Sequence, residues 1–331
     1  MSIAYGAMTA RFRVVALAGA AFWAVPAGAA DDAANYPNRP IRVVIGFSAG
    51  SSVDLSARVI GAKLAEAWKH AVVADNRPGA GGAIAGQIVA KANPDGYTLI
   101  SVSAAHVILP ALSSKQPYDL RDFAGITTTV TVPSVLVVAP SLGVKSVKDL
   151  IAMAKAKPGE LLFSSGGVGS STHFAAELFK SYAAIDARHV PFKGIPEALT
   201  EAMVGRVQFT MSPVASVLPL AKAGKVVALA VTPAKRSSAM PDVPTLAEAG
   251  VPGYRWDTWF GLLAPAKTPR AVVRKLHQEV SRILVLPDSR KHWETMGAEP
   301  LPITPEAFDQ YIAEQSQQVI RLAKAANIRI D

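Results

Sequence analysis

Two stretches of this chain follow the same plan: a run of apolar residues, a turn of glycine and serine, and then an amphipathic segment. The first stretch, residues 43–60, reads VVIGFSAGSSVDLSARVI, and the second, residues 161–182, reads LLFSSGGVGSSTHFAAELFKSY. Apolar runs of this kind favour buried strands, and apolar residues at helical spacing favour a helix. Each stretch therefore predicts a strand, a turn and a helix, the repeating unit of an α/β layered domain.

Strand and helix signals alternate through the remaining sequence, which indicates two such domains. Further strands are predicted at 70–76, 97–102, 134–140 and 227–232. A chain of 331 residues, half of them hydrophobic, is long enough to bury a core in each domain. In doubly wound sheets such Gly/Ser turns lie at the carboxyl ends of strands, where ligands bind. Two turns that face each other would therefore hold one ligand from both sides.

The N-terminus has the organisation of a secretion signal. Arg11 and Arg13 precede an apolar run at 14–25, and small residues follow it up to Ala27 and Ala29. The apolar run is too short to span a bilayer, and the small residues resemble a cleavage site. We therefore predict that residues 1–29 form a signal peptide, that cleavage follows Ala29, and that the mature protein is exported.

The composition excludes several kinds of site. The chain has no cysteine, so disulfides, thiolate chemistry and cysteine-based metal sites are ruled out. None of the six histidines forms a pair at His-x-x-x-His spacing, and no dinucleotide or P-loop glycine pattern occurs, so we expect neither a metal nor a cofactor. The formal charge is +9, but the basic residues are scattered, which favours a solvated surface over a nucleic-acid partner.

The first turn contains the sequence GFSAG at 46–50, which matches the G-x-S-x-G motif of a serine nucleophile between a strand and a helix. One hypothesis is therefore an exported serine hydrolase that uses Ser48. Such an enzyme needs a general base and an oxyanion-hole loop earlier in the chain. Only residues 31–40 precede the first strand of the mature chain, and no histidine lies in a context that marks it as the base. This hypothesis is the alternative rather than the preferred one.

The same turn can instead hold an anion. A Gly/Ser turn that opens a helix presents unpaired backbone N–H groups, and the helix dipole adds partial positive charge. That arrangement binds a carboxylate or a phosphate without Arg or Lys. Ser51 and Ser52 could add hydroxyl donors and Phe47 an apolar wall. Because SSGGVGSST at 164–172 repeats the arrangement in the second presumed domain, we favour binding over catalysis.

Six motifs in chain order resemble the tripartite tricarboxylate transporter receptors, the Bug-type family of periplasmic solute-binding proteins. They are YPNRPIRVVIGFSAGSSVDLSAR, VVADNRPGAGGAIAGQIVAKANPDGYTL, QPYDLRDFAGIT, FSSGGVGSSTHFAAELF, HVPFKGIPEALTEAMVGRVQF and PDVPTLAEAGVPGYRWDTWFGLLAPAKTP. The chain departs from the family pattern at Ser51, where a second glycine is usual, at Leu109, where asparagine commonly precedes Pro110, and at Ser212, where aspartate is frequent.

The resemblance implies a fold and a function. The fold is α/β, with two doubly wound domains joined by two crossovers that close like a Venus flytrap. The first domain would comprise 31–132 and 256–331, and the second 133–255. The function would be capture of a small organic carboxylate in the periplasm (a di- or tricarboxylate, an amino acid or an aromatic acid), for the permease subunits of a tripartite transporter or for a sensor kinase. We expect a monomer without catalytic activity.

The resemblance also implies which residues bind the ligand. Family members hold it largely with main-chain amides of the two turns, which correspond here to 47–52 (the first turn) and 165–172 (the second turn). Asp54 corresponds to an acidic residue that caps the first helix. The predicted ligand-binding residues are Phe47, Ser48, Ala49, Gly50, Ser51, Ser52, Ser103, His106, Ser165, Gly166, Gly167, Gly169, Ser170, Ser171, Thr172 and Trp259.

Overall fold

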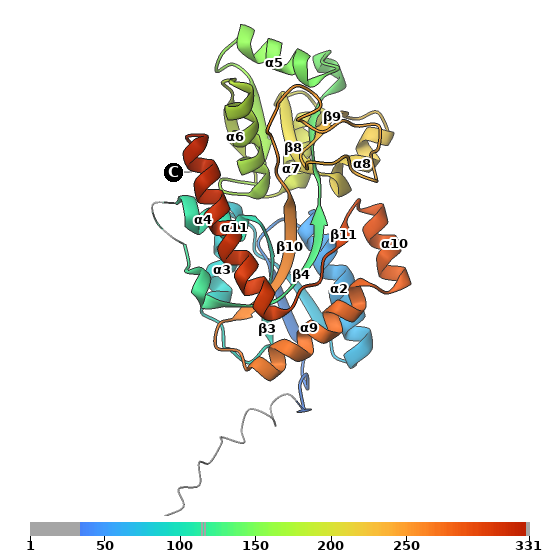
Figure 1. The fold of residues 1–331 in the computed structure, drawn as a ribbon. Helices are drawn as coiled ribbons and strands as arrows, with labels where there is room; N and C mark the ends of the chain where they lie inside the picture. Colours follow the sequence, from blue (N-terminus) through green and yellow to red (C-terminus); the bar gives the residue numbers. More distant parts are fainter. Residues whose placement is uncertain (1–33, 114, 116, 329–331) are drawn as a thin grey trace, which may run out of the picture.

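The computed structural model describes residues 34–113, 115 and 117–328, so the predicted signal peptide at 1–29 lies outside the described residues. The described chain forms two lobes, each built on a β-sheet with helices on both faces (Figure 1). This is the α/β architecture that the sequence predicted. Within the described residues no helix is both long and apolar enough to cross a membrane.

The first lobe contains a six-stranded mixed sheet in the order β11-β4-β10-β3-β1-β2. Its strands are β1 (Ile41–Ile45), β2 (Val72–Asn76), β3 (Thr98–Ser103), β4 (Phe123–Val132), β10 (Thr258–Pro265) and β11 (Glu299–Pro300). One face packs against α2 (Ser52–Trp68), α9 (Arg270–Leu284) and α10 (Pro287–Thr295); the other packs against α3 (Ala83–Ala90), α4 (Ala105–Leu112) and α11 (Pro305–Ala325). β1, β2 and β3 are parallel, whereas β10 runs antiparallel to β3 and β4.

The second lobe contains a five-stranded sheet in the order β7-β6-β8-β5-β9. Its strands are β5 (Ser134–Val138), β6 (Leu162–Ser165), β7 (Arg188–Pro191), β8 (Phe209–Pro213) and β9 (Val227–Val231). Helices α5 (Val147–Ala156) and α6 (Ser171–Ala183) cover one face, and α7 (Ile195–Met203) and α8 (Val214–Lys222) cover the other. Three short 3-10 helices, η1 (Ala80–Gly82), η2 (Leu120–Asp122) and η3 (Pro140–Leu142), complete the described elements.

The covering of both faces explains why the central strands are buried along most of their length. In β1, Val43 and Ile45 belong to the hydrophobic cluster that includes α2 and α9, whereas Val44 belongs to the cluster on the opposite face. Successive side chains of a strand point to opposite faces, so each face buries alternate residues of the same run. Because β1, β2 and β3 run parallel, their carboxyl ends lie at one edge of the sheet, and the turns that follow them lie there.

The chain passes between the two lobes twice, at neighbouring points. Pro133 joins β4 directly to β5, and residues 232–257 return from β9 to β10 (Figure 1). Hydrogen bonds connect the two passages: the N–H of Thr232 donates to the carbonyl of Ser134 at 2.9 Å, and the N–H of Trp256 donates to the carbonyl of Thr232 at 3.0 Å.

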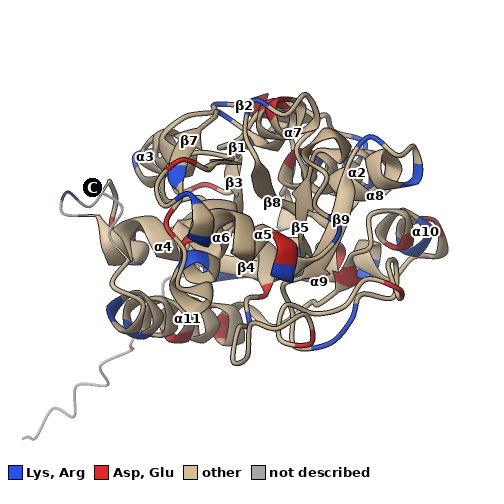
Figure 2. Cartoon of the chain, turned by 90° about the horizontal axis from the view of Figure 1, so that it is seen from above, with Lys and Arg blue, Asp and Glu red and all other residues tan. Residues whose placement is uncertain are grey.

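Basic and acidic residues alternate over the outer helices and loops, as the view from above shows (Figure 2). This distribution agrees with the scattered basic residues of the sequence. Neither charge forms a long stripe in that view of the described chain, so the surface resembles an ordinary solvated one.

Candidate functional site

The two Gly/Ser turns open their helices in the same way. Ser51 caps α2, and its hydroxyl accepts the N–H of Asp54 at 3.4 Å; Ser170 caps α6, and its hydroxyl accepts the N–H of His173 at 3.1 Å. Both caps have extended backbone angles, with φ and ψ of −67° and 156° for Ser51 and −66° and 159° for Ser170. The repeated sequence pattern is therefore a repeated local structure.

Capping leaves two N–H groups free at each helix start. No acceptor in the described chain takes the N–H of Ser52 or Val53 in α2, or the N–H of Ser171 or Thr172 in α6. All four residues line one cavity between the lobes. Unpaired N–H groups at the positive ends of two helix dipoles form a site that favours a negatively charged group.

Both lobes contribute to the wall of this small cavity. Its lining residues are Phe47, Ser51, Ser52, Val53, Ser103, Thr258 and Phe260 from the first lobe, and Gly166, Ser170, Ser171, Thr172, Ile195 and Pro213 from the second. This lining, which lies wholly within the described chain, contains no Lys, Arg, Asp or Glu side chain. A charged group bound here would be held by dipoles and hydrogen bonds rather than by an ion pair.

The predicted site residues fall into three groups. Those that line the cavity are Phe47, Ser51, Ser52, Ser103, Gly166, Ser170, Ser171 and Thr172. Those that lie in the turns without lining it are Ser48, Ala49, Gly50, Ser165, Gly167 and Gly169. His106 lines a smaller adjoining cavity, and Trp259 lies elsewhere. The N–H of Gly50 is already used, because it donates to the Asp54 carboxylate at 2.9 Å.

Asp54 holds the first turn in shape. Besides the N–H of Gly50, its carboxylate accepts from Arg58 at 3.0 Å and from the Asn76 amide at 2.9 Å. Burial raises the pKa of this carboxyl, but the hydrogen bonds from Arg58, Gly50 and Asn76 outweigh burial and hold the pKa below its usual value. Asn76 also donates to the carbonyl of Phe47 at 3.0 Å. The carboxylate therefore supports the turn, as expected for a cap rather than a ligand contact.

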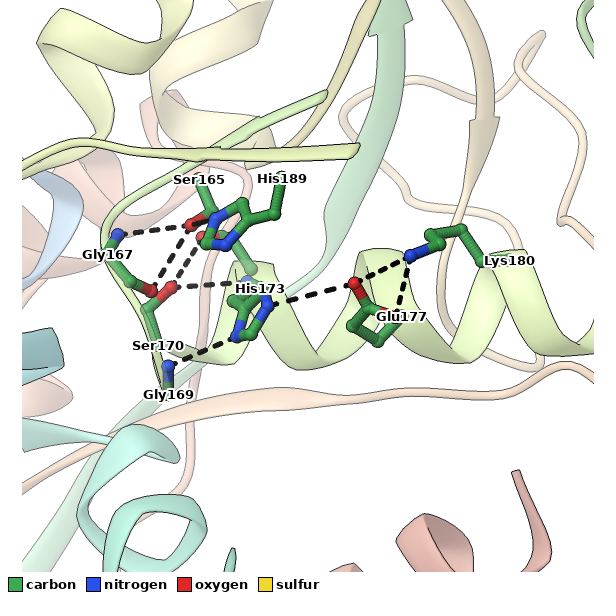
Figure 3. A network of polar contacts seen from close by, with 9 residues as sticks. Ser165, Gly167, Gly169, Ser170, His173, Glu177, Lys180 and His189 are labelled. Atoms are coloured by element: carbon green, nitrogen blue, oxygen red, sulfur yellow. Dashed lines mark hydrogen bonds and ion pairs between the residues drawn. The ribbon is translucent and has the colours of Figure 1, made fainter. Parts of the chain in front are cut away.

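Two stacked histidines, the buried His173 and the half-buried His189, hold the second turn in shape (Figure 3). The N–H of Gly169 donates to Nδ1 of His173 at 3.1 Å, and the N–H of Gly167 donates to Oγ of Ser165 at 3.1 Å. Ser165 Oγ lies 2.6 Å from Nε2 of His189, whose ring stacks on His173 with centroids 4.0 Å apart.

Burial is the main reason that the pKa of His173 falls to about 3 and that of His189 to about 4. His173 must be neutral at Nδ1, because this nitrogen accepts a hydrogen bond. Ser165, Gly167 and Gly169 thus contribute by shaping the turn.

Five residues that line the cavity were not predicted from the sequence: Val53, Ile195, Pro213, Thr258 and Phe260. The alternation of side chains along β10 explains the largest difference. Trp259 is fully buried on the opposite side of the strand, where its ring lies 5.6 Å from Phe308 and 5.5 Å from Tyr311. Its neighbours Thr258 and Phe260 face the cavity. The period of two in a strand was the signal that could have separated these neighbours.

The two lobes touch across the cleft. Ser48 Oγ of the first lobe donates to the Glu197 carboxylate of α7 at 2.7 Å, and the hydroxyls of Ser52 and Ser216 lie 3.1 Å apart. A methyl group placed on Gly194 would lie 2.8 Å from the Ser48 side chain, so the lobes approach closely here. The hydrogen-bond partner of the Ser48 hydroxyl in the described chain is thus a carboxylate, not the histidine that a nucleophile requires.

Comparison with known proteins gives consistent matches along the chain. The model of the family described as "Tripartite tricarboxylate transporter family receptor" matches residues 56–328. Protein BugT of Bordetella pertussis is 34% identical over 286 residues, which cover 86% of this chain and 88% of BugT.

Two solved structures are also similar in fold and sequence. "R. palustris Rpa4515 with adipate" has a TM-score of 0.86 and 35% identity, covering 89% of this chain and 99% of Rpa4515. MatC (Rpa3494) from Rhodopseudomonas palustris with bound malate has a TM-score of 0.83 and 30% identity, covering 87% of this chain and 99% of MatC.

The matched family is one of transporter receptors rather than enzymes, and the two similar structures hold small carboxylates. This confirms the expectation of a protein that is not an enzyme, and it decides against the hydrolase hypothesis for Ser48. The predicted two-domain fold of periplasmic binding proteins is confirmed by the same structures. The chain belongs to the tripartite tricarboxylate transporter receptor family, the Bug-type periplasmic solute-binding proteins.

Proposed function

We propose that this receptor captures a small organic carboxylate between its lobes and presents it to the membrane subunits of a tripartite tricarboxylate-type transporter. The observation that carries the proposal is the set of four free N–H groups, on Ser52, Val53, Ser171 and Thr172, around one uncharged cavity. A carboxylate has two oxygens, each able to accept two hydrogen bonds, so it matches four donors. Adipate and malate in the two similar structures are carboxylates, which supports the same class here.

The lining also favours an anion over other solutes. A cation would face the positive ends of two helix dipoles with no carboxylate nearby, and a sugar would leave the apolar wall of Phe47, Phe260 and Ile195 poorly matched. A short hydrocarbon chain or ring fits that wall, and the carboxylate end fits the donors. The predicted residues that line the cavity are the proposed ligand contacts, together with Val53, Thr258, Phe260, Ile195 and Pro213.

The proposal includes a hinge. We assign 31–132 with 256–331 to the first domain and 133–255 to the second, so the two neighbouring passages between the sheets would flex when the cleft opens and closes. Residues 1–29 would direct export to the periplasm. Delivery to permease subunits fits the family, and a sensor kinase is the other partner expected from the resemblance. We expect the receptor to act as a monomer.

A thermal-shift screen tests the ligand class. A ligand at about 100 times its dissociation constant stabilises the folded state by about 2.7 kcal/mol, which raises the melting temperature of a chain of this size by several degrees. We expect such a shift from at least one member of a panel of mono-, di- and tricarboxylates, amino acids and aromatic acids, and none from the corresponding methyl esters. If esters or neutral sugars shift the protein as strongly as the acids, the proposed ligand class is wrong.

A proline substitution tests the backbone donors directly. Proline is tolerated at the first position of a helix but has no N–H, and the extended Ser51 is a suitable residue to precede it. Ser52→Pro should weaken binding of the active acid about 10- to 100-fold, because a hydrogen bond to a charged group contributes about 1.5–3 kcal/mol.

Ser52→Ala is the matched control: it removes the hydroxyl that contacts Ser216 but keeps the N–H, and it should cost about tenfold at most. Calorimetric titration of both variants measures the difference. Equal affinities for the two variants would contradict the role of this N–H.

A further inference from the structure

One hydrogen bond joins the two lobes outside the interlobe cavity. The Ser48 hydroxyl of the first turn donates to Oε1 of Glu197 at 2.7 Å, and Glu197 lies in the first turn of α7 in the second lobe. Neither residue lines the cavity. We call this pair of side chains the latch. Because the latch crosses the cleft without lining the cavity, it can affect how the lobes close without contacting a ligand between them.

The other side-chain hydrogen bonds between the lobes differ from the latch in this respect. The hydroxyls of Ser52 and Ser216 lie 3.1 Å apart. The hydroxyl of Thr258 lies 3.0 Å from that of Ser171 and 3.5 Å from that of Ser134. Each of these pairs contains a residue that lines the cavity, so changing it would also change the wall around the ligand. Within the described chain, the latch can be removed while that wall stays intact.

The first lobe holds Ser48 in position through its backbone. The carbonyl of Ser48 accepts the N–H of Ser51 at 3.2 Å, within the first turn. The carbonyl of the preceding residue, Phe47, accepts from the Asn76 amide at 3.0 Å. The same contacts that shape the first turn therefore direct the Ser48 side chain toward the second lobe.

The second lobe leaves room for this side chain at Gly194, the residue that precedes α7. A Cβ atom on Gly194 would lie 2.8 Å from Oγ of Ser48 and 3.1 Å from Oε2 of Glu197. A side chain at this position would therefore occupy the space in which the serine and the glutamate meet. The glycine allows the hydrogen bond of the latch to form.

The chemistry of the latch suits a contact that forms and breaks as the lobes move. Ser48 is the hydrogen-bond partner that the described chain offers the Glu197 carboxylate, and a hydroxyl that donates to a charged oxygen forms one of the stronger hydrogen bonds. Glu197 is exposed and Ser48 is half-exposed, so water can replace the bond when the lobes separate. The latch therefore stabilises the closed state and leaves no unsatisfied group in the open state.

We propose that the latch determines how long the closed receptor retains its ligand, and that it does so by the same factor for every ligand that the cavity accepts. This inference rests on the proposed function, in which a carboxylate is captured between the lobes. It gives Ser48 of the GFSAG sequence a role in closure. Because the hydrogen bond forms only when the lobes meet, its loss should speed release and leave docking on the open receptor unchanged.

Ser48→Ala and Glu197→Ala test the latch through the rates of binding and release. The probes are radiolabelled adipate, malate, succinate and benzoate; rapid filtration measures their association, and their release after a chase with the unlabelled acid. For each acid that binds the wild-type receptor, we expect release about 2- to 10-fold faster in either variant and an association rate within about twofold of the wild type. A residue that contacted the ligand would instead change release by different factors for different acids.

A double-mutant cycle separates the hydrogen bond from the other effects of each residue. Glu197 lies near the N-terminus of α7, where a negative charge also stabilises the helix. If the contact between the two side chains is responsible, the double variant should release each acid no faster than the faster single variant. Glu197→Gln keeps an oxygen that can accept from Ser48 but lacks the charge, so its release rate should lie between those of the wild type and Glu197→Ala.

Glu201→Ala is the matched control on the same helix. The carboxylate of Glu201 accepts from Arg206 at 2.8 Å within the second lobe, so its loss does not affect a contact between the lobes. This variant should release each acid at the wild-type rate. Thermal unfolding without ligand checks that every variant is folded.

The outcomes separate the inference from the proposed function. If none of the acids binds the wild-type receptor, the proposed function fails and the inference fails with it. If acids bind but Ser48→Ala and Glu197→Ala release them at the wild-type rate, the latch has no role and the proposed function stands. Slower association with unchanged release, or additive effects in the double variant, would overturn the inference in the same way.

Discussion

Replacing Gly194 by alanine should abolish tight ligand capture while the protein without ligand remains folded. The new methyl group would lie 2.8 Å from both Cβ and Oγ of Ser48, closer than real side-chain carbons approach. Gly194 belongs to the second lobe and Ser48 to the first, so the clash is relieved when the cleft opens. The backbone of Gly194 is extended, with φ of −171°, so alanine introduces no backbone strain.

The expected loss of affinity is large because, in the proposed function, closure supplies half of the hydrogen bonds to the ligand. Losing two N–H contacts to a charged group at about 1.5–3 kcal/mol each corresponds to more than about 100-fold. Calorimetry with the acid that stabilises the wild-type protein measures the loss. Small-angle scattering should show that ligand compacts the wild-type protein but not Gly194→Ala. If the variant binds as tightly as the wild type, the bound state does not bring the lobes this close.

A second substitution across the cleft provides the matched control. Ser48→Gly removes the side chain that the new methyl group would meet, at the expense of the hydrogen bond to Glu197. The double variant should therefore bind better than Gly194→Ala alone and about as well as Ser48→Gly alone. The double-mutant cycle isolates the contact between the lobes from any effect of alanine at the start of α7.

The folded protein should lose stability steeply as the pH falls below about 6.5, well above the range where carboxylates titrate. His106 and His173 each have a pKa lowered from 6.5 to about 3, with burial the largest cause. Below about pH 6.5 the unfolded chain binds a proton at each position that the folded chain does not bind. Each histidine therefore contributes stability that is complete above that pH and is lost as the pH falls toward 3.

By about pH 5 the loss amounts to about 2 kcal/mol for each of these two histidines, or about 4 kcal/mol together. That is a large share of the 5–15 kcal/mol typical of a whole domain. His189 adds to the effect in the same direction, since burial lowers its pKa to about 4, but it is partly exposed and its share is smaller. Urea unfolding at a series of pH values measures the slope, which gives the number of protons taken up on unfolding.

Single variants identify which histidines cause this pH dependence of stability. His106→Phe should reduce the proton uptake on unfolding by about one in the window between about pH 6 and pH 4. The exposed His292 offers the matched control, because His292→Phe changes a ring that stays in solvent. A slope unchanged by His106→Phe would mean that this ring is not kept neutral by burial.

The strand, turn and helix that the sequence predicted in each lobe are present because local rules govern their formation. Ser51 and Ser170 each cap a helix, because the hydroxyl of a serine just before a helix can accept the N–H of the residue three positions later. The strand, turn and helix in each lobe need only nearby residues for their formation. Their shared pattern therefore could be read from the chain.

The rest depends on contacts between distant segments. The N–H of Gly50 donates to the Asp54 carboxylate. The orientation of that carboxylate is fixed partly by Asn76, a residue of the neighbouring strand. Alternation along β10 separates Thr258 from Trp259, but which of the two faces the cavity depends on how β10 lies in the sheet beside β4. Ile195 reaches the cavity only because β6 lies beside β7 and β8 in the second sheet. Apolar patterns predict that such residues are buried, but they do not predict which residues they contact.

The even division of the free N–H groups, two on α2 and two on α6, bears on how the receptor releases its cargo. A ligand that arrives at the open receptor can dock on one lobe alone, with half of its contacts, and the second pair forms as the lobes come together. Release of the ligand needs no competing solute. In the proposed function, a membrane partner that holds the lobes apart would withdraw two contacts at once, and the remaining pair would retain the ligand only briefly. Release would then be driven by a change in the distance between the lobes.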